Sequence, residues 1–305
     1  MAVETSPTAN PHSRSQTWLV IAAWIGVLLV SSFPEILFDA LGASPPAWLA
    51  WAKPASMALL LALCLVWQPL RLLWQFAAVM LVFSAGDSLA QAVFASPTWQ
   101  GRFAGSSFFT FYMSIFVVDF ALAAAVLAAL WLVKRRRQDF YLTRGQLDAP
   151  VEPVRWLGIK PGESWRVFGW IFAGCAMLAV FFPTILALRP SGDQLARALP
   201  LLPAAILFAA INAFNEEAYF RLSTLATLPQ AVGRTQAMLL NVTLFGLAHY
   251  LYGSPGGILG FLMTAFLAFL MGKAVLETRG LFWAWLIHLL PDVVVFFSYA
   301  LGWVG

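Results

Sequence analysis

The stretch SFFTFYMSIFVVDFALAAAVLAALWLVKRRR, residues 107–137, joins a long apolar run to a block of four basic residues. About 20 apolar residues in a row are enough to span a hydrocarbon core about 30 Å thick. Basic residues that directly follow such a run act as a stop-transfer and orientation signal. The stretch therefore predicts a membrane helix over 107–133 that ends at Lys134, Arg135, Arg136 and Arg137.

The rest of the chain repeats this pattern. Apolar residues make up 61% of the 305 residues and charged residues only 10%, whereas soluble domains use about 25% charged residues. Strand-like alternation is absent, which favours a helix bundle over a barrel. We predict an all-α, polytopic transmembrane helix bundle of eight or nine membrane helices. The full set of predicted spans is 17–38, 47–67, 70–94, 107–133, 167–188, 200–228, 235–252, 257–277 and 281–303.

The polar segments divide the chain into regions. Residues 1–16 are polar and rich in Ser, Thr, Pro and Asn, which predicts a disordered tail. They lack the features of a cleaved secretory signal, so we expect the first helix to be retained. A four-helix membrane region is expected over 17–133, and a cytoplasmic surface loop over 134–166. The remaining helices form a C-terminal membrane region over 167–305.

The distribution of basic residues predicts the orientation. With nine helices and a cytoplasmic N-terminus, 14 of the 18 basic residues lie on the cytoplasmic side and 4 lie outside, in accord with the positive-inside rule. We therefore expect an N-terminus in the cytoplasm and a multi-pass protein of the cytoplasmic (inner) membrane. The net charge of +4 does not indicate nucleic acid, because the basic residues flank helices. The two cysteines, Cys64 and Cys175, lie in apolar runs and predict no disulfide or cysteine metal site.

Two adjacent carboxylates interrupt the predicted helix over 200–228. An acidic residue at the centre of a membrane helix costs about 2.5–3.5 kcal/mol, so such residues normally face the bundle interior and mark a functional site. Glu217 and Arg221 are four residues apart and can pair. Glu216 lies about 100° away, on a face shared with Asn212. A structural ion pair of Glu217 with Arg221 is one interpretation, and a direct chemical role is the other.

Two of the three histidines lie in the predicted membrane helices that follow. His249 comes three residues after Gly246, which leaves room for close packing. His288 and Asp292 are four residues apart and share a face, and Pro291 frees a backbone carbonyl there. Carboxylate and histidine together suit the activation of water, followed by proton transfer to a leaving amine. A metal is the alternative, since both are also metal ligands, although His-Glu-x-x-His is absent.

The ordered set Glu216-Glu217-x-x-x-Arg221, Phe245-x-x-x-His249 and His288-x-x-x-Asp292 resembles the CPBP family, the CAAX-processing and bacteriocin-processing intramembrane proteases related to Rce1-type prenyl endopeptidases. The match covers about residues 200–300. The resemblance implies that Glu216 and His249 activate water and that His288 and residue 292 stabilise the oxyanion. It also implies that Glu217 and Arg221 hold the site together.

The resemblance leaves two points open. Many members carry Asn where this chain has Asp292, and an ionised Asp cannot donate to an oxyanion. Asp292 then orients His288, binds a metal or is protonated. The cofactor is a divalent metal such as zinc, held by Glu216, His249 and His288, or there is none, as in a metal-free glutamate mechanism.

Counting about 1.5 Å per residue along straight helices places Glu216 and His288 nearer the cytoplasmic side than His249.

Acidic residues in the N-terminal half support a rival interpretation. Ser84, Asp87, Ser88 and Gln91 form a polar stripe, and Asp119 lies inside the next helix. Intramembrane acids can mark proton pathways, so a proton-coupled transporter is one alternative and a non-catalytic scaffold is another. The stripe can equally pack inside the bundle.

The favoured prediction is an intramembrane endopeptidase that hydrolyses a peptide bond of a membrane-associated precursor or anchor peptide. Its expected partners are that peptide or protein substrate and the lipid bilayer, with no nucleic acid.

Overall fold

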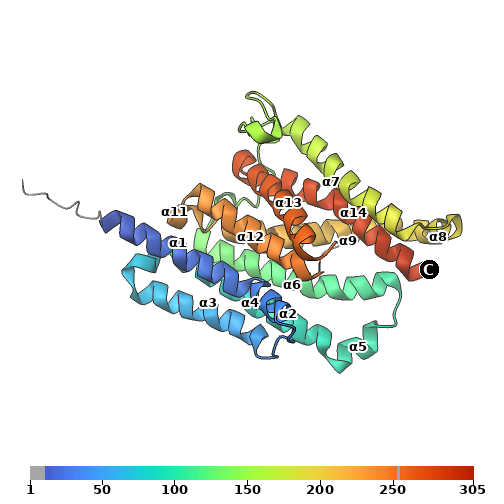
Figure 1. The fold of residues 1–305 in the computed structure, drawn as a ribbon, viewed down its shortest axis with the longest axis horizontal. Helices are drawn as coiled ribbons and strands as arrows, with labels where there is room; N and C mark the ends of the chain where they lie inside the picture. Colours follow the sequence, from blue (N-terminus) through green and yellow to red (C-terminus); the bar gives the residue numbers. More distant parts are fainter. Residues whose placement is uncertain (1–10, 253–254) are drawn as a thin grey trace, which may run out of the picture.

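The computed structural model describes residues 11–252 and 255–305, and every named element in these ranges is a helix. Figure 1 shows long helices lying roughly along one axis of the molecule, with the C-terminus at one end. Two isolated backbone bridges, Pro150 to Ser164 and Val154 to Ile159, are the other regular pairings in the described part. The prediction of an all-α bundle is confirmed.

Seven helices or helix runs in the described residues are long and apolar enough to cross a membrane, and one bent pair brings the number to eight. Their average composition matches that of lipid-spanning segments. The chain is therefore a multi-pass membrane protein. The seven are α3 (Leu49–Val66), η1 (Gln68–Leu73) with α4 (Trp74–Ala95), α6 (Phe108–Lys134), α7 (Trp165–Leu188), the run Gly192–Val232, α13 (Gly257–Thr278) and α14 (Phe282–Val304).

The run Gly192–Val232 is a series of short elements. It contains α8 (Gly192–Ala198), η4 (Leu199–Leu201), α9 (Leu202–Glu216), the π-helix η5 (Glu217–Leu222), α10 (Ser223–Leu225) and α11 (Pro229–Val232).

One of the nine predicted spans, 235–252, is less apolar than the other long helices. Helix α12 (Arg234–Tyr252) was expected to cross the membrane, but it does not pass as a candidate span among the described residues. Its polar side chains, among them Gln236 and Asn241, lower its hydropathy. Asn241 is fully buried, which shows that the helix packs inside the bundle without being apolar all round.

The first predicted span is bent. Helices α1 (Pro11–Val30) and α2 (Phe33–Ala40) meet at 64°. Ser31 accepts a hydrogen bond from the Phe33 amide at 3.1 Å, and Pro34 sits in the first turn of α2, where its missing N–H is tolerated. Helix α1 also begins earlier than residue 17, so part of the predicted tail is helical. Residues 1–10 of that tail lie outside the described residues.

The polar segment 134–166 is tied to the C-terminal helices. It contains η2 (Arg137–Phe140) and η3 (Arg155–Leu157), and α5 (Pro97–Phe103) is the remaining short helix of the chain. Gly145 and Gly280 pack so closely that a Cβ on Gly280 would lie 2.3 Å from the Gly145 nitrogen. The buried Lys273 donates to the Glu152 carbonyl at 2.7 Å. These contacts fasten the segment to α13 and to the loop that precedes α14.

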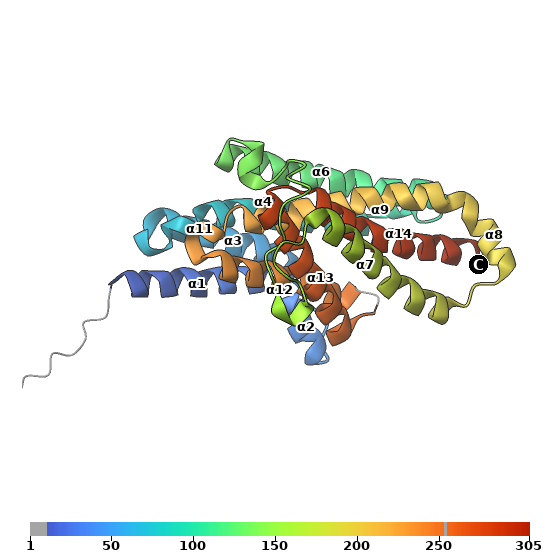
Figure 2. The same cartoon turned by 90° about the horizontal axis from the view of Figure 1, so that it is seen from above.

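The C-terminal helices form the part of the bundle that holds the polar site. Helix α14 packs between α7 and α9, while α12 packs against α13. Figure 2 shows α7 crossing over α14 on one side of the molecule and the N-terminal helices on the other. The site therefore lies between helices of the second half, with α6 of the first half against α9.

Candidate active site

The helix that carries the two glutamates changes its winding at the site. Helix α9 ends at Glu216, and a π-helix follows over Glu217–Leu222. Single π turns within α-helices occur frequently at functional sites. The Phe220 carbonyl accepts from Nδ2 of Asn241 at 2.8 Å and from the Thr224 hydroxyl at 2.5 Å. These bonds satisfy backbone groups that the altered winding leaves free.

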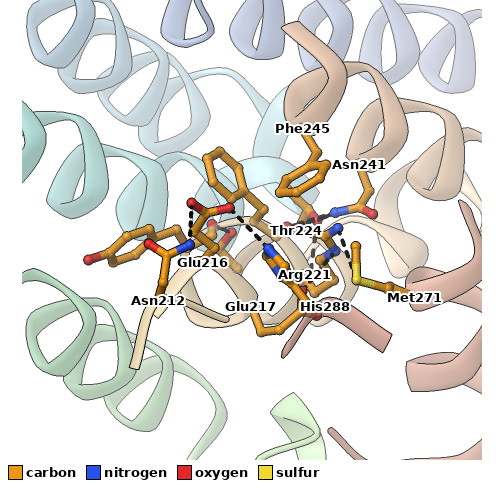
Figure 3. A network of polar contacts seen from close by, with 12 residues as sticks. Asn212, Glu216, Glu217, Arg221, Thr224, Asn241, Phe245, Met271 and His288 are labelled. Atoms are coloured by element: carbon orange, nitrogen blue, oxygen red, sulfur yellow. Dashed lines mark hydrogen bonds and ion pairs between the residues drawn. The ribbon is translucent and has the colours of Figure 1, made fainter. Parts of the chain in front are cut away.

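Glu217 and Arg221 form a fully buried pair. Both side chains are 0% exposed, and Nε of Arg221 lies 3.5 Å from Oε1 of Glu217. The guanidinium carbon also lies 3.7 Å from the centre of the Phe245 ring, and an Nη nitrogen reaches Sδ of Met271 at 3.6 Å. Figure 3 shows this cluster behind His288. The predicted pairing is confirmed, and the Phe245 ring adds a cation–π contact.

His288 joins this buried pair to the other acidic residues. Its Nδ1 lies 2.9 Å from Oε1 of Glu217. On the opposite edge, Nε2 lies 3.5 Å from Oε2 of Glu216 and 3.7 Å from Oδ2 of Asp292. Both nitrogens face carboxylate oxygens, so the ring is arranged to act as a donor on both edges.

Asn212 links two of the carboxylates. Its Nδ2 donates to Oε1 of Glu216 at 3.1 Å and to Oδ2 of Asp292 at 3.0 Å. The prediction that Asn212 and Glu216 share a face is confirmed (Figure 3). Oε2 of Glu216 is buried and has no hydrogen-bond partner among the residues that the structure describes. One oxygen is therefore held by Asn212, and the other faces Nε2 of His288 at 3.5 Å and can still accept a hydrogen bond from a ligand.

His249 is oriented by its own helix. Its Nδ1 lies 3.0 Å from the Phe245 carbonyl, one turn earlier. A carbonyl can only accept, so this contact assigns the proton to Nδ1 and leaves Nε2 as the acceptor nitrogen. A Cβ on Gly246 would lie 2.9 Å from Phe261, and one on Gly260 would lie 2.9 Å from the His249 carbonyl. As predicted, glycines let α12 and α13 approach closely beside His249.

A cavity of about 730 Å³ brings the predicted residues together. Four of them, Glu216, His249, His288 and Asp292, line it together with Asn212. Most of its other walls are apolar, as in typical substrate pockets with a few convergent polar groups. The remaining lining side chains come from α7, η5, α12, α13, α14 and the residue at 255: Phe172, Cys175, Ala176, Ala179, Val180, Phe220, Phe245, Ala248, Tyr252, Pro255, Gly260, Met263, Thr264, Phe266, Leu267, Leu270, Pro291, Val295, Phe296 and Tyr299.

Counting residues along straight helices places His249 at a different depth from Glu216 and His288, but in the structure the three residues lie at one cavity. His249 lines the same cavity as Glu216 and His288. Straight-helix counting overlooks the π-helix after Glu216, in which each turn holds more residues than an α-helical turn. It also overlooks the inclination of α12 to α9, which is visible in Figure 1.

The residues proposed as metal ligands do not fit a metal site. Within residues 11–252 and 255–305, no group of three or more His, Cys, Asp or Glu side chains is placed to hold a metal ion. Both ring nitrogens of His288 already face carboxylates of the chain. We therefore derive no chemical step through a metal.

The polar stripe in α4 takes part in helix packing. Ser84 and Ser88 are 2% and 4% exposed, and the Ser88 hydroxyl donates to the Ala50 carbonyl of α3 at 2.6 Å. This contact supports the interpretation of the stripe as packing. The Asp119 carbonyl accepts from the Tyr219 hydroxyl, which joins α6 to the π-helix.

Several residues of the site had not been predicted. Asn241, Met271 and the α7 wall of the cavity carry no motif in the sequence. The sequence offers one signal for Asn241: a polar residue inside a buried helix needs a hydrogen-bond partner nearby. Cys175 lies in an apolar run of the sequence, yet it is exposed and lines the cavity. Cys64 is buried in α3.

With this geometry in place, comparison with known proteins identifies the region. Residues 198–294 match the family described as type II CAAX prenyl endopeptidase Rce1-like. The chain carries an Rce1-like region. Neither the curated proteins nor the solved structures contain a match to this chain.

The Rce1-like region contains every residue of the predicted site, from Asn212 to Asp292. It begins in α8 and ends in α14, so it includes the π-helix and the polar end of the cavity. The family supports a CAAX-type intramembrane endopeptidase in general, which acts on membrane-associated substrates. The helices before residue 198 lie outside the Rce1-like match.

Proposed function

We propose that this chain is an endopeptidase of the cytoplasmic (inner) membrane, which hydrolyses a peptide bond of a membrane-associated precursor or anchor peptide by general-base attack of water. One observation carries the proposal. Oε2 of Glu216 is buried at the polar end of an otherwise apolar cavity, and apart from the 3.5 Å approach of Nε2 of His288 it has no hydrogen-bond partner among the described residues.

Water activation uses the two residues that keep a free acceptor. A water molecule between Oε2 of Glu216 and Nε2 of His249 would lose its proton to Glu216 as its oxygen attacks the peptide carbonyl carbon. General-base assistance of this kind contributes about 10²–10⁴-fold to the rate. Asn212 fixes Oε1 of Glu216, so the reacting oxygen is oriented before the substrate binds.

His288 supplies the charge that the tetrahedral intermediate needs. Glu217 holds Nδ1, and the Nε2–H edge is directed toward Glu216 and Asp292. A carbonyl oxygen that becomes negative beside this edge would accept its hydrogen bond. Preorganised donors of this type contribute about 10²–10³-fold. Asp292 accepts from Asn212 and orients both Asn212 and His288, which suits an ionised residue that cannot itself donate.

Collapse of the intermediate completes the reaction. The C–N bond breaks, the proton held by Glu216 passes to the leaving amine, and the carbonyl reforms as a carboxylic acid. Each proton that Glu216 takes from water is thus returned to product. The step needs no oxidant, reductant or metal.

The apolar walls indicate the kind of peptide that is bound. Residues 288 to 299 of α14 line the cavity over about 16 Å, at about 1.5 Å per residue. An extended peptide of about five residues covers this length. The segment beside the scissile bond is therefore apolar, as in a membrane anchor. The basic residues at the end of α6 support a cytoplasmic location for that end of the bundle.

The proposal is tested by co-expression with a panel of tagged, membrane-anchored precursors, with new termini scored by mass spectrometry. Wild type is compared with Glu216→Gln and His249→Gln. Asp193→Asn, an exposed acid on α8 away from the cavity, is the control. We expect new termini from wild type and the control, and none from the two site variants once insertion is verified. Identical termini from Glu216→Gln would overturn the proposed site.

A further inference from the structure

A second cavity, of about 540 Å³, lies at the charged end of the bundle. It is separate from the catalytic cavity and shares no lining residue with it. The first half of the chain and the Rce1-like region both contribute walls. Its lining residues are Gln75, Val133, Lys134, Asp139, Tyr141, Leu225, Ala226, Pro229, Gln230 and Arg279.

Half of the ten lining side chains can donate hydrogen bonds. Lys134 and Arg279 are cationic, and Asp139 is the one acid among the lining residues. Gln75 and Gln230 add amides that both donate and accept. Nε2 of Gln75 points to the Val133 carbonyl at 3.5 Å, which ties η1–α4 to the end of α6. The lining set therefore carries one net positive charge and several neutral donors.

Arg279 is held in position beside Tyr141. Its guanidinium carbon lies 5.0 Å from the centre of the Tyr141 ring, and Nη1 donates to the Tyr141 hydroxyl at 3.4 Å. Both residues have positive φ, 57° for Arg279 and 59° for Tyr141, and neither is a glycine. A non-glycine residue in this conformation persists only where its surroundings enforce it. The guanidinium is thus preorganised, and Nη1 is one of its five donors.

The location of the cavity matches the depth of lipid headgroups. Lys134 is the last residue of α6, a helix with the length and composition of a membrane span. Arg135, Arg136 and Arg137 follow it and are exposed. Basic clusters directly beside a membrane helix attract anionic groups, at about 1 kcal/mol per residue near the surface.

We propose that this cavity binds a phosphate-bearing anion through Lys134 and Arg279, with the phosphate supplied by an anionic phospholipid headgroup or by free phosphate. Arg279 contributes fork-shaped hydrogen bonds and Lys134 a point charge, a combination suited to phosphate oxygens. Gln230 lies at the exposed rim. The proposal is independent of the proteolytic function.

The same cavity lies a few residues from two of the elements that carry the catalytic site, η5 and α14. Leu225 and Ala226 lie three and four residues after the π-helix ends, and Arg279 lies three residues before α14 begins. The loop at Arg279 is also fixed to segment 134–166, because the Leu281 amide donates to the Thr143 carbonyl at 2.8 Å. An anion bound here would therefore lie close in sequence to the elements that carry Glu217 and His288, without touching either residue.

Binding is measured by native mass spectrometry of the full-length protein in detergent. The probes are dioctanoyl phosphatidylglycerol, the neutral dioctanoylglycerol and inorganic phosphate. We expect the phosphatidylglycerol to bind wild type, and Lys134→Gln and Arg279→Gln each to weaken it about fivefold, the factor for about 1 kcal/mol. Arg155→Gln, an exposed arginine of segment 134–166 outside the cavity, should leave binding unchanged.

A second pair of variants tests the same site without changing a buried residue, so that a loss of binding cannot be explained by misfolding. Gln230→Glu and Gln230→Lys change an exposed rim residue, and we expect the first to weaken and the second to strengthen binding. Displacement of the lipid by millimolar phosphate identifies free phosphate as the source, whereas resistance to displacement identifies the headgroup. Equal binding of dioctanoylglycerol, or unchanged affinity in Arg279→Gln and both Gln230 variants, would overturn the proposal.

Discussion

Nδ1 of His288 and Oε1 of Glu217 lie 2.9 Å apart, although 71 positions separate them in the chain. The contact joins α14 to the π-helix inside the bundle, and Glu217 is fully buried. Because Arg221 compensates the same carboxylate, the orientation of the His288 ring depends on an ion pair that never meets substrate. We therefore expect Glu217 to act by positioning His288.

Replacement of Glu217 should reduce turnover more than substrate binding. Glu217→Gln keeps an oxygen that can accept from Nδ1 of His288, but it removes the charge that stabilises the ring. We expect kcat to fall about 10²-fold with KM changed less than about threefold, as for a group that acts mainly in the transition state. Steady-state cleavage of an identified substrate peptide measures both. A rise in KM alone would assign Glu217 to substrate binding.

Arg221 should be important for stability. Arg221→Met leaves the Glu217 carboxylate buried without its partner, which costs about 3–5 kcal/mol. Arg166→Met is the matched control, because Arg166 pairs with Asp148 at 2.6 Å with both side chains more than half exposed. Such a surface pair contributes about 0–1 kcal/mol. Thermal unfolding in detergent should separate the two variants, and equal melting temperatures would contradict the buried pairing.

Asp292 should tolerate an amide but not an apolar side chain. In Asp292→Asn the remaining oxygen still accepts from Nδ2 of Asn212, so Asn212 and Glu216 keep their positions. We expect cleavage within about tenfold of wild type. Asp292→Leu removes the acceptor and should lower kcat by about 10²–10³-fold. A loss of that size in Asp292→Asn would show that the negative charge itself is required.

Gly260 should be sensitive because of its contact with His249. A Cβ at this position would lie 2.2 Å from the Pro255 carbonyl oxygen and 2.9 Å from that of His249. Gly260→Ala must displace the end of α12, and a shift of about 1 Å in a catalytic group can cost about 10²-fold in rate. Gly174→Ala on α7 is the control, since nothing lies within 4 Å of its Cβ position. Equal activity of the two variants would argue against tight packing at His249.

Chelation of metal ions should leave cleavage intact. The proposed steps use only Glu216, His249 and His288, and the described residues include no set of three ligands placed for a metal. We expect activity to persist after dialysis against a strong chelator. Metal analysis of the active protein should then give far less than one equivalent of zinc. Loss of activity that is restored by added zinc would establish a metal site instead.

The sequence was sufficient to predict the helix bundle and the residues of the polar centre. Membrane spans follow from the length of apolar runs, and Glu216, Glu217 and His288 were recognisable because buried ionisable groups are costly. The pairing of Glu217 with Arg221 follows from helical spacing. Their catalytic roles stay predictions until the variants are measured.

Other features depend on tertiary structure and had no local signal. The cation–π contact of Arg221 joins η5 to Phe245 of α12, so helical spacing cannot reveal it. The hydrogen bond from Asn241 to the Phe220 carbonyl likewise joins two elements. Helix α12 does not pass as a candidate span among the described residues because of its polar side chains, and the one at Asn241 is surrounded by protein neighbours.

The π-helix has a consequence for the alignment of this chain with related sequences. One extra residue in a turn rotates everything that follows by about 100° relative to a continuous α-helix. A helical wheel drawn straight through 202–225 therefore assigns wrong directions to one half of the helix. Deleting a single residue within Glu217–Leu222 would restore regular winding and turn either Glu216 or Arg221 away from its partners. The π-helix thus sets the directions in which the side chains before and after it point. We therefore expect the number of residues in Glu217–Leu222 to be constrained as strictly as the identity of its charged residues.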